Sequence, residues 1–413
     1  MRASAICCAV LTVTFAGSAV AKESPSFEMT WSDLVGRLDA LPQLQEARFL
    51  ARAAEAGVDA VGQVQNPEAE VRLGSGMPHG GQSDAFEWGV GLSLPFDWVG
   101  PRGAEVRAAR SEADACRQDA RLTRRSVLGR LAGLFWRIVF DQRLVATLEE
   151  TESQVARLAS MIRLRVEKGE ARPPELPRIE TELERVRIDL DRARADARSE
   201  RRSLAVVMGL PDGVEPRVHA EPVGWPAPCG RDDAVRSVLA AHPRLAAAQS
   251  RIQARDAMVA AEKARRIPGF SLGGYFDRES DRDVAGGLLQ VRLPVWNWNS
   301  GGIRRAEAQR QAETMAAEVA LRDLVAETGE AWERCVQGRD SVSRFETEIL
   351  PRAEAASRAV ERGFELGEFS LIEVLDARRV LLDVRKEQIG TGLRARAECT
   401  ALAVLTGGIE DVR

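Results

Sequence analysis

The sequence predicts a mainly helical protein, duplicated in tandem, in which each copy joins two membrane-type β-strands to very long helices. Three observations predict this fold class. The chain repeats itself at a spacing of about 200 residues, four short segments alternate between apolar and polar residues, and the intervening segments keep helical periodicity over dozens of residues. Each copy is therefore expected to run helix, strand, strand, very long helix, turn and helix.

The first 21 residues have the features of a signal peptide. Arg2 precedes a short apolar run, and the segment ends on Ala19-Val20-Ala21, the small-x-small pattern that signal peptidase recognises. We therefore expect an exported chain that begins near Lys22. No later segment approaches the roughly 20 apolar residues that a membrane-spanning helix needs, so a membrane role would have to use strands.

The internal repeat is anchored by prolines and glycines. Leu41-Pro42 recurs as His242-Pro243, an offset of 201 residues (243 − 42), and the segment LAVVMG at 204–209 recurs as LAVLTG at 402–407, an offset of 198 (402 − 204). Offsets that drift so little indicate one duplicated unit. The expected organisation is a signal peptide at 1–21, a first repeat at 22–220 and a second repeat at 221–413.

The strands are expected at 68–77 and 85–94 in the first copy, and at 269–277 and 283–295 in the second. In 85–94 the even positions are Phe, Trp, Val, Leu and Leu, whereas Glu, Gly, Gly and Ser stand between them. Strands of about 10 residues with one apolar and one polar face suit a membrane barrel with lipid outside and water inside. A soluble hairpin is the rival interpretation.

Three tryptophans, Trp98, Trp296 and Trp298, follow the strand ends, where an interfacial aromatic belt in contact with outer-membrane lipid is expected. Four strands cannot close a barrel, and open strand edges cannot exist in lipid. Several protomers must therefore share one barrel, with eight strands from two chains or twelve from three.

The helices are unusually long. No proline occurs between Pro101 and Pro173, and apolar residues recur there every three or four positions, which predicts a helix about 100 Å long. The return path consists of 175–207 and 243–266, about 50 and 36 Å, so that the chain regains the level of the strands before the second copy begins. The second copy repeats this path over 303–366 and 372–405, with a kink expected at Pro351.

Composition excludes several classes of protein. The net charge is −4 and no basic block occurs, so nothing favours nucleic-acid binding. With three histidines and no recognisable nucleophile, metal-ligand or phosphate-loop motif, the chain is not expected to be an enzyme, to hold a metal or to need a cofactor. The spacing of Cys116, Cys229, Cys335 and Cys399 allows at most one disulfide and leaves its partners open.

One segment is specific enough to suggest a family. Residues 367–377, GEFSLIEVLDA, and their first-copy counterpart at 169–176, GEARPPEL, resemble the periplasmic helix-turn-helix tips of the outer-membrane efflux protein family typified by TolC. Within that family the chain is similar to the branch that is paired with heavy-metal resistance pumps. The likeness covers essentially the whole mature chain.

The resemblance implies a homotrimer, with a twelve-stranded barrel in the outer membrane and a helical tube that crosses the periplasm to a membrane-fusion adaptor and an RND-type inner-membrane pump. The duct itself would be passive. Heavy-metal cations are the expected substrate, while drugs or secreted polypeptides stay open. A periplasmic coiled-coil adaptor is the rival class, although adaptors carry one hairpin and this chain predicts two.

The resemblance also implies roles for residues at the tips. Residues expected to contact the adaptor are Gly169, Glu170, Gly367, Glu368, Phe369 and Ser370. Glu373 and Asp376 lie three residues apart on one helix face and would line the closed aperture as a ring of carboxylates. The alternative is that both acids pair with Arg378 or Arg379. The first copy departs from the pattern, since Pro173-Pro174 stiffens its tip and Arg178 replaces the second acid.

Overall fold

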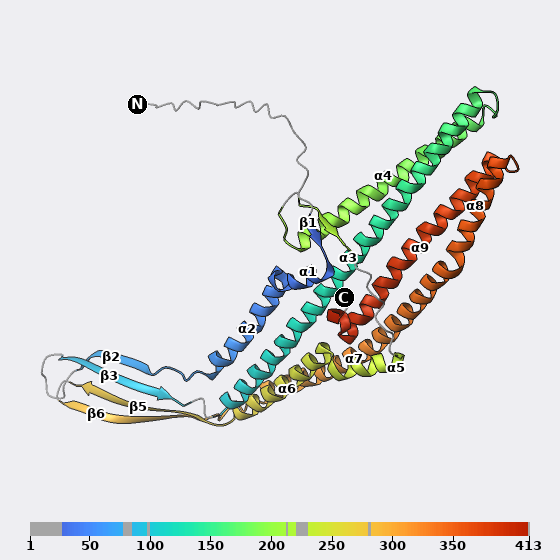
Figure 1. The fold of residues 1–413 in the computed structure, drawn as a ribbon. Coiled ribbons are helices and arrows are strands. Elements are labelled where there is room, and N and C mark those ends of the chain that lie inside the picture. The colour runs from blue at the N-terminus through green and yellow to red at the C-terminus, as the bar shows by residue number, and fades with distance from the viewer. Residues whose placement is uncertain are drawn as a thin grey trace, which may run out of the picture.

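The computed structural model describes residues 27–76, 85–96, 100–211, 214–219, 230–279 and 282–411. The molecule is elongated (Figure 1): a four-stranded sheet forms one end, two helical hairpins form the other, and long helices connect them. The expected signal peptide, Trp98 and Cys229 lie outside the described residues.

The four expected strands form one antiparallel sheet in the order β2-β3-β5-β6. Their bounds are β2 (Glu68–Gly76), β3 (Ala85–Pro95), β5 (Gly269–Arg278) and β6 (Asp283–Arg292). β6 ends before the expected residue 295 because Pro294 has no N–H to donate to a ladder. Large apolar side chains on one face are exposed to the surroundings, among them Val71, Leu73, Phe86, Leu92, Leu272 and Leu289.

The long helices match the expected path. The first copy contains α2 (Pro42–Gly62), α3 (Arg102–Glu167) and α4 (Glu175–Val207), and the second contains α6 (Pro243–Ala264), α7 (Ser300–Arg344), α8 (Leu350–Leu366) and α9 (Leu371–Thr406). α3 has 66 residues, which corresponds to a length of about 100 Å.

A π-helical turn, Phe345–Ile349, joins α7 to α8 directly before Pro351. Pro351 has no backbone N–H to donate to the helix. The π-helical turn accommodates this missing hydrogen bond, and the helix continues from α7 into α8. The expected kink is thus a local change of helical winding.

Two pairs of glycines display the duplication. Gly169 and Gly367 have φ of 77° and 82°, and Gly209 and Gly407 have φ of 64° and 85°; each pair is separated by 198 residues (367 − 169 and 407 − 209). Because L-residues with side chains avoid this left-handed region, glycine is favoured at each of these four helix ends.

A small mid-height region anchors the long helices. β1 (Phe27–Met29) pairs in parallel with β4 (Pro216–Val218), and α1 (Trp31–Gly36), the short 3₁₀ helices Leu38–Ala40 and Gly408–Asp411, and α5 (Arg231–Ala241) lie nearby. The largest hydrophobic cluster lies here, where Leu34 and Trp31 pack against α3 residues such as Phe135. It joins the start of the described chain to the ends of α4 and α9.

A disulfide between Cys335 and Cys399 ties α7 to α9 at this level. One turn toward the tip, a β-carbon on Gly338 would lie 2.9 Å from the α-carbon of Ala395, so the two helix backbones approach closely. Copy one has an ion pair at the equivalent level, Arg137 with Glu200 at 2.9 Å. The copies therefore share a path and differ in how their hairpins are joined.

Candidate functional site at the helical tips

Each hairpin tip turns at one of the repeated glycines. In the second tip the Gly367 N–H donates to the Phe364 carbonyl at 3.1 Å, and the Glu368 N–H donates to the Gly363 carbonyl at 2.8 Å. In the first tip the Gly169 and Glu170 N–H groups donate to the carbonyls of residues 166 and 165 at 3.0 and 2.8 Å. Both tips are therefore helix ends closed by the same left-handed glycine turn.

The six residues for which the family resemblance implies adaptor contact are exposed at the ends of the hairpins: Gly169, Glu170, Gly367, Glu368, Phe369 and Ser370. Apolar side chains accompany them in the second tip. Leu366 is 77% exposed and Ile372 is 56% exposed, while Phe369 packs partly over Gly363. The second tip thus presents an apolar surface to its surroundings.

The two tips are held together by a shared hydrophobic cluster. Ile162 of α3 and Ile179 of α4 are fully buried with Phe364 of α8 and Val374 of α9. The Arg165 guanidinium lies 5.8 Å from the centre of the Phe364 ring and adds a cation–π contact between the copies. A movement of the second tip away from the first would expose this cluster.

Glu373 closes a capping box at the start of α9. The Ser370 N–H donates to its carboxylate at 2.7 Å, and the Ser370 side chain accepts from the Glu373 N–H. The Ser370 N–H holds the pKa of Glu373 below its usual range, and the Ser370 hydroxyl adds to this effect. The pattern Ser370-x-x-Glu373 signals this capping role in the sequence, and it is a role beyond the two expected for Glu373, at the aperture or paired with a neighbouring arginine.

Asp376 lies one turn further along α9 and is exposed. The nearby arginines pair with other carboxylates: Arg378 Nε lies 3.0 Å from Glu361 Oε1 on α8, and Arg379 Nε donates to Glu182 Oε1 on α4 at 3.1 Å. Among the described residues, Asp376 and Glu373 form no ion pair with either arginine. The hydrogen bond to Glu182 is the first cause of the raised pKa of the Arg379 guanidinium, and the charge of Asp376 adds to it. The alternative pairing of these acids with their helical neighbours therefore stays a prediction.

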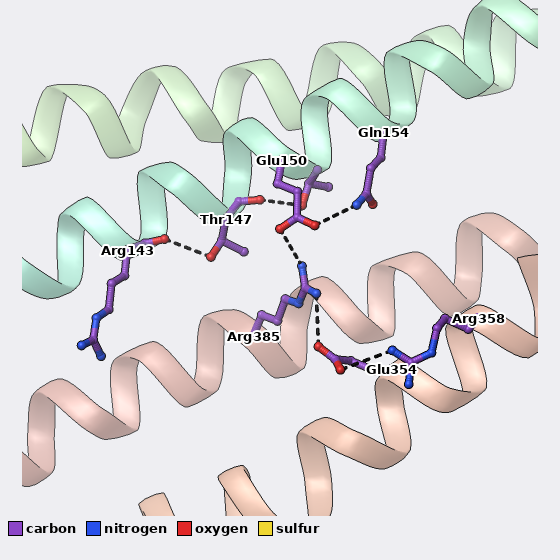
Figure 2. A network of polar contacts seen from close by, with 8 residues as sticks. Arg143, Thr147, Glu150, Gln154, Glu354, Arg358 and Arg385 are labelled. Atoms are coloured by element: carbon purple, nitrogen blue, oxygen red, sulfur yellow. Dashed lines mark hydrogen bonds and ion pairs between the residues drawn. The ribbon is translucent and has the colours of Figure 1, made fainter.

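Charged contacts continue along the hairpins below the tips. Arg385 of α9 donates to Glu150 of α3 and to Glu354 of α8, both at 3.2 Å, and Arg358 completes the network (Figure 2). Lys386 donates to Asp189 of α4 at 2.7 Å. The second hairpin is thus joined to both helices of the first by polar side chains.

Two of the expected belt tryptophans are described, both just past the end of β6. Trp296 is 96% exposed and Trp298 is 59% exposed, and the Trp298 carbonyl accepts a hydrogen bond from Arg266. Both lie between the end of β6 at Arg292 and the start of α7 at Ser300, and their place in a membrane-interface belt stays a prediction.

Among the described residues, no group of three or more His, Cys, Asp or Glu side chains is arranged to hold a metal ion. No helix in this part of the chain is both long enough and apolar enough to cross a bilayer.

The fold combines two unlike helical hairpins with a sheet that has an exposed apolar face, and it repeats after 198 residues. These are the features of a class of outer-membrane channel. The model of the outer membrane efflux protein family matches residues 38–210 and 234–408. The chain belongs to this family, which is the TolC family expected from the tip sequences. It lies in the outer membrane and extends into the periplasm, and members of the family are trimeric channels without enzymatic activity.

Individual relatives agree with this assignment. The cobalt-zinc-cadmium resistance protein CzcC of Cupriavidus metallidurans is 26% identical over 308 residues, 72% of each chain. The pyoverdine export outer membrane protein OpmQ of Pseudomonas putida is 24% identical over 337 residues, 79% of this chain and 71% of OpmQ. The crystal structure of CusC superposes with a TM-score of 0.78 at 16% identity, covering 94% of this chain and 95% of CusC. The rival assignment as a periplasmic adaptor is thereby excluded.

Proposed function

We propose that three copies of this chain form the exit duct of a tripartite efflux system that passes heavy-metal cations to the cell exterior. One observation carries the proposal: the second tip presents an exposed acidic face, Glu373 and Asp376, while the adjacent Arg378 and Arg379 pair with other carboxylates. An exposed acidic face at the entrance suits the passage of cations.

Threefold symmetry would bring six of these carboxylates around the entrance. A ring of this kind attracts cations and repels anions. The two acids contribute differently, because the Glu373 carboxylate is bound to Ser370 at the helix start whereas Asp376 is exposed on the helix face. We therefore assign to Asp376 the carboxylate that is free to face ions at the aperture. Glu373 instead fixes the start of α9.

The tips would also meet the partners of the duct. The exposed side chains of Leu366 and Ile372 offer apolar contact area, and the glycine turns let the backbone of another protein approach closely. We propose a periplasmic adaptor as the protein that contacts these tips, and an RND-type pump in the inner membrane as the component that selects substrate. The belt tryptophans would fix the height of the duct at the membrane surface.

The cargo follows from similarity and from charge. CzcC is named for cobalt, zinc and cadmium resistance, and the acidic aperture favours the same class of ion. OpmQ is named for pyoverdine export, so a small organic cargo is the second candidate.

A growth experiment tests the cargo. Deletion of the gene is expected to sensitise the host to cobalt, zinc, cadmium or copper, and the wild-type gene on a plasmid is expected to restore growth. Unchanged metal tolerance together with impaired release of an organic siderophore would contradict the metal assignment and favour the second candidate.

A bilayer experiment tests the aperture. The double variant E373Q/D376N is expected to loosen the closed aperture and thereby raise the conductance of the purified trimer. It should also lower the cation preference, because it removes six negative charges from the entrance. The matched control is Glu175→Gln, which changes the first-copy residue equivalent to Glu373 (373 − 198 = 175). Unchanged conductance and cation preference in the double variant would refute the aperture assignment.

A further inference from the structure

Three residues on neighbouring strands form one row across the polar face of the sheet. Arg72 of β2 is directly opposite Gly89 of β3, and Gly89 is directly opposite Asp277 of β5. The Arg72 guanidinium nevertheless bonds to Asp277, with Nη2 donating to Oδ1 at 2.9 Å and to Oδ2 at 3.2 Å. The ion pair therefore spans a complete strand, a separation of about 9 to 10 Å between backbones.

Gly89 makes this bridge possible. A β-carbon at position 89 would collide with the Asp277 carboxylate, which lies directly above the glycine. Gly89 is buried beneath it even though it stands in a sheet whose two faces are otherwise open in the single chain. The absence of a side chain thus lets both charged groups lie along the sheet instead of projecting from it.

A second side chain in the same region lies flat in the same way. Tyr275 is opposite Gly286 of β6, and a β-carbon on Gly286 would lie 2.7 Å from the tyrosine hydroxyl. The Arg72 guanidinium is 5.7 Å from the centre of the Tyr275 ring. Arg72, Asp277 and Tyr275 therefore form one continuous polar layer on this face of the sheet. The layer covers Gly89 of β3 and Gly286 of β6.

We propose that Arg72 is a positioning residue for permeation: it holds Asp277 flat and neutralised over Gly89, so that the duct stays wide and uncharged at this level of the sheet. The proposal rests on the proposed function, because it places the polar face of the sheet toward the water-filled passage. Both side chains are partly exposed, Arg72 at 48% and Asp277 at 24%, so ions in the passage can reach the bridge. Three chains place three such bridges around the duct.

The charges of the two bridge residues determine how removing either one changes the preference of the duct for cations over anions. Without Arg72, three Asp277 carboxylates would face the passage and favour cations. Without Asp277, three guanidinium groups would remain and favour anions. The effect is largest at low ionic strength, because the screening length is about 10 Å at 0.1 M salt and about 30 Å at 0.01 M.

The test measures ion selectivity in planar bilayers at low salt, in the E373Q/D376N background that removes the acids of the aperture. Arg72→Gln is expected to raise the cation-to-anion permeability ratio by about twofold, and Asp277→Asn is expected to lower it by a similar factor. The double variant R72Q/D277N is expected to return close to the background. A general loss of stability would not shift the permeability ratio in opposite directions in the two single variants and restore it in the double variant.

Glycine substitutions test the steric half of the proposal. Gly89→Ala is expected to push Asp277 into the passage, to break the bridge and to reduce conductance at unchanged trimer yield. Gly91→Ala is the matched control, on the same strand and the same face, because a β-carbon there has only ordinary contacts of 3.8 Å or more. Its conductance is expected to equal that of the background.

The two proposals fail separately. The aperture is judged by comparing wild type with the E373Q/D376N background, whereas the bridge is judged only by variants within that background. Selectivity that does not change in R72Q and D277N, or equal effects of Gly89→Ala and Gly91→Ala, would overturn the assignment of Arg72 while leaving the exit duct intact.

Discussion

Lys386 of α9 donates a hydrogen bond to Asp189 of α4 seven residues beyond the pair formed by Arg379 and Glu182, with 386 − 379 and 189 − 182 both equal to 7. Two helical turns separate the pairs, so both lie on the same side of the contact between the two hairpins. Together they hold the second tip against the first.

Replacing Lys386 by Gln should therefore favour opening of the duct. The pair is about one-third exposed, and we expect a loss of up to about 1 kcal/mol per chain, which corresponds to a several-fold increase in open probability. Single-channel recording of the purified trimer measures this change. Arg194→Gln is the control, because Arg194 pairs with Glu149 within the first hairpin; equal behaviour of the two variants would contradict a specific role between hairpins.

The Cys335–Cys399 disulfide should contribute strongly to stability. It closes a loop with a sequence separation of 64 residues, for which the chain-entropy model gives about 4 kcal/mol. We expect C335A/C399A to lower the temperature at which the trimer loses its folded state, measured by intrinsic fluorescence. Cys116→Ala removes the half-buried free thiol and should leave that temperature nearly unchanged; a similar decrease in both variants would argue against the cross-link as the cause.

Two glycine-to-alanine substitutions should change the free energy of unfolding in opposite directions. Gly367 has φ of 82°, so alanine there should cost about 1 kcal/mol and disturb the second tip. Gly133 lies inside α3 with open space around its α-carbon, so alanine should stabilise the helix by about 0.5 to 1 kcal/mol. Thermal unfolding of both variants checks the pair, and destabilisation by Gly133→Ala would show that this open space is needed in the assembled trimer.

Asp141 on α3 should make stability depend on pH. Burial, together with the charge of the nearby Glu200, raises the pKa of this carboxyl to about 6. The folded state therefore disfavours the ionised form, a penalty that is fully present above about pH 6 and vanishes as the pH falls toward the ordinary value of 3.8.

Asp141→Asn should thus stabilise the protein at pH 7.5 by on the order of 1 kcal/mol, because water partly screens this half-buried group. The advantage should disappear near pH 4. Melting temperatures of wild type and variant across this range check the sign, and a constant difference at all pH values would assign the effect to packing instead.

The sequence predicted those parts of the structure that depend on local pattern. Period-two alternation located β2 and β3 to within one residue, and the prolines around 101 and 173 bounded α3. The repeated glycines marked the turns of both tips because their left-handed backbone has a strong residue preference. Each of these features is encoded within a few neighbouring residues.

Other features depend on contacts between distant segments and could not be predicted. Nothing in three residues at 27–29 specifies parallel pairing with 216–218. The choice of Cys335 and Cys399 among four cysteines depends on the closeness of α7 and α9. The partner of Arg379 likewise follows from how α9 is rotated against α4, which periodicity alone does not fix.

The cross-link between α7 and α9 also orders the events of maturation. Cytosolic thiols stay reduced, so Cys335 and Cys399 can join only after export. The first hairpin, whose equivalent level relies on Arg137 and Glu200, needs no such oxidation. The second hairpin, which carries the acidic tip, therefore acquires its covalent restraint only in the compartment where the duct works. A chain retained in the cytosol would lack the Cys335–Cys399 disulfide in its second copy, while its first copy would need no further covalent step.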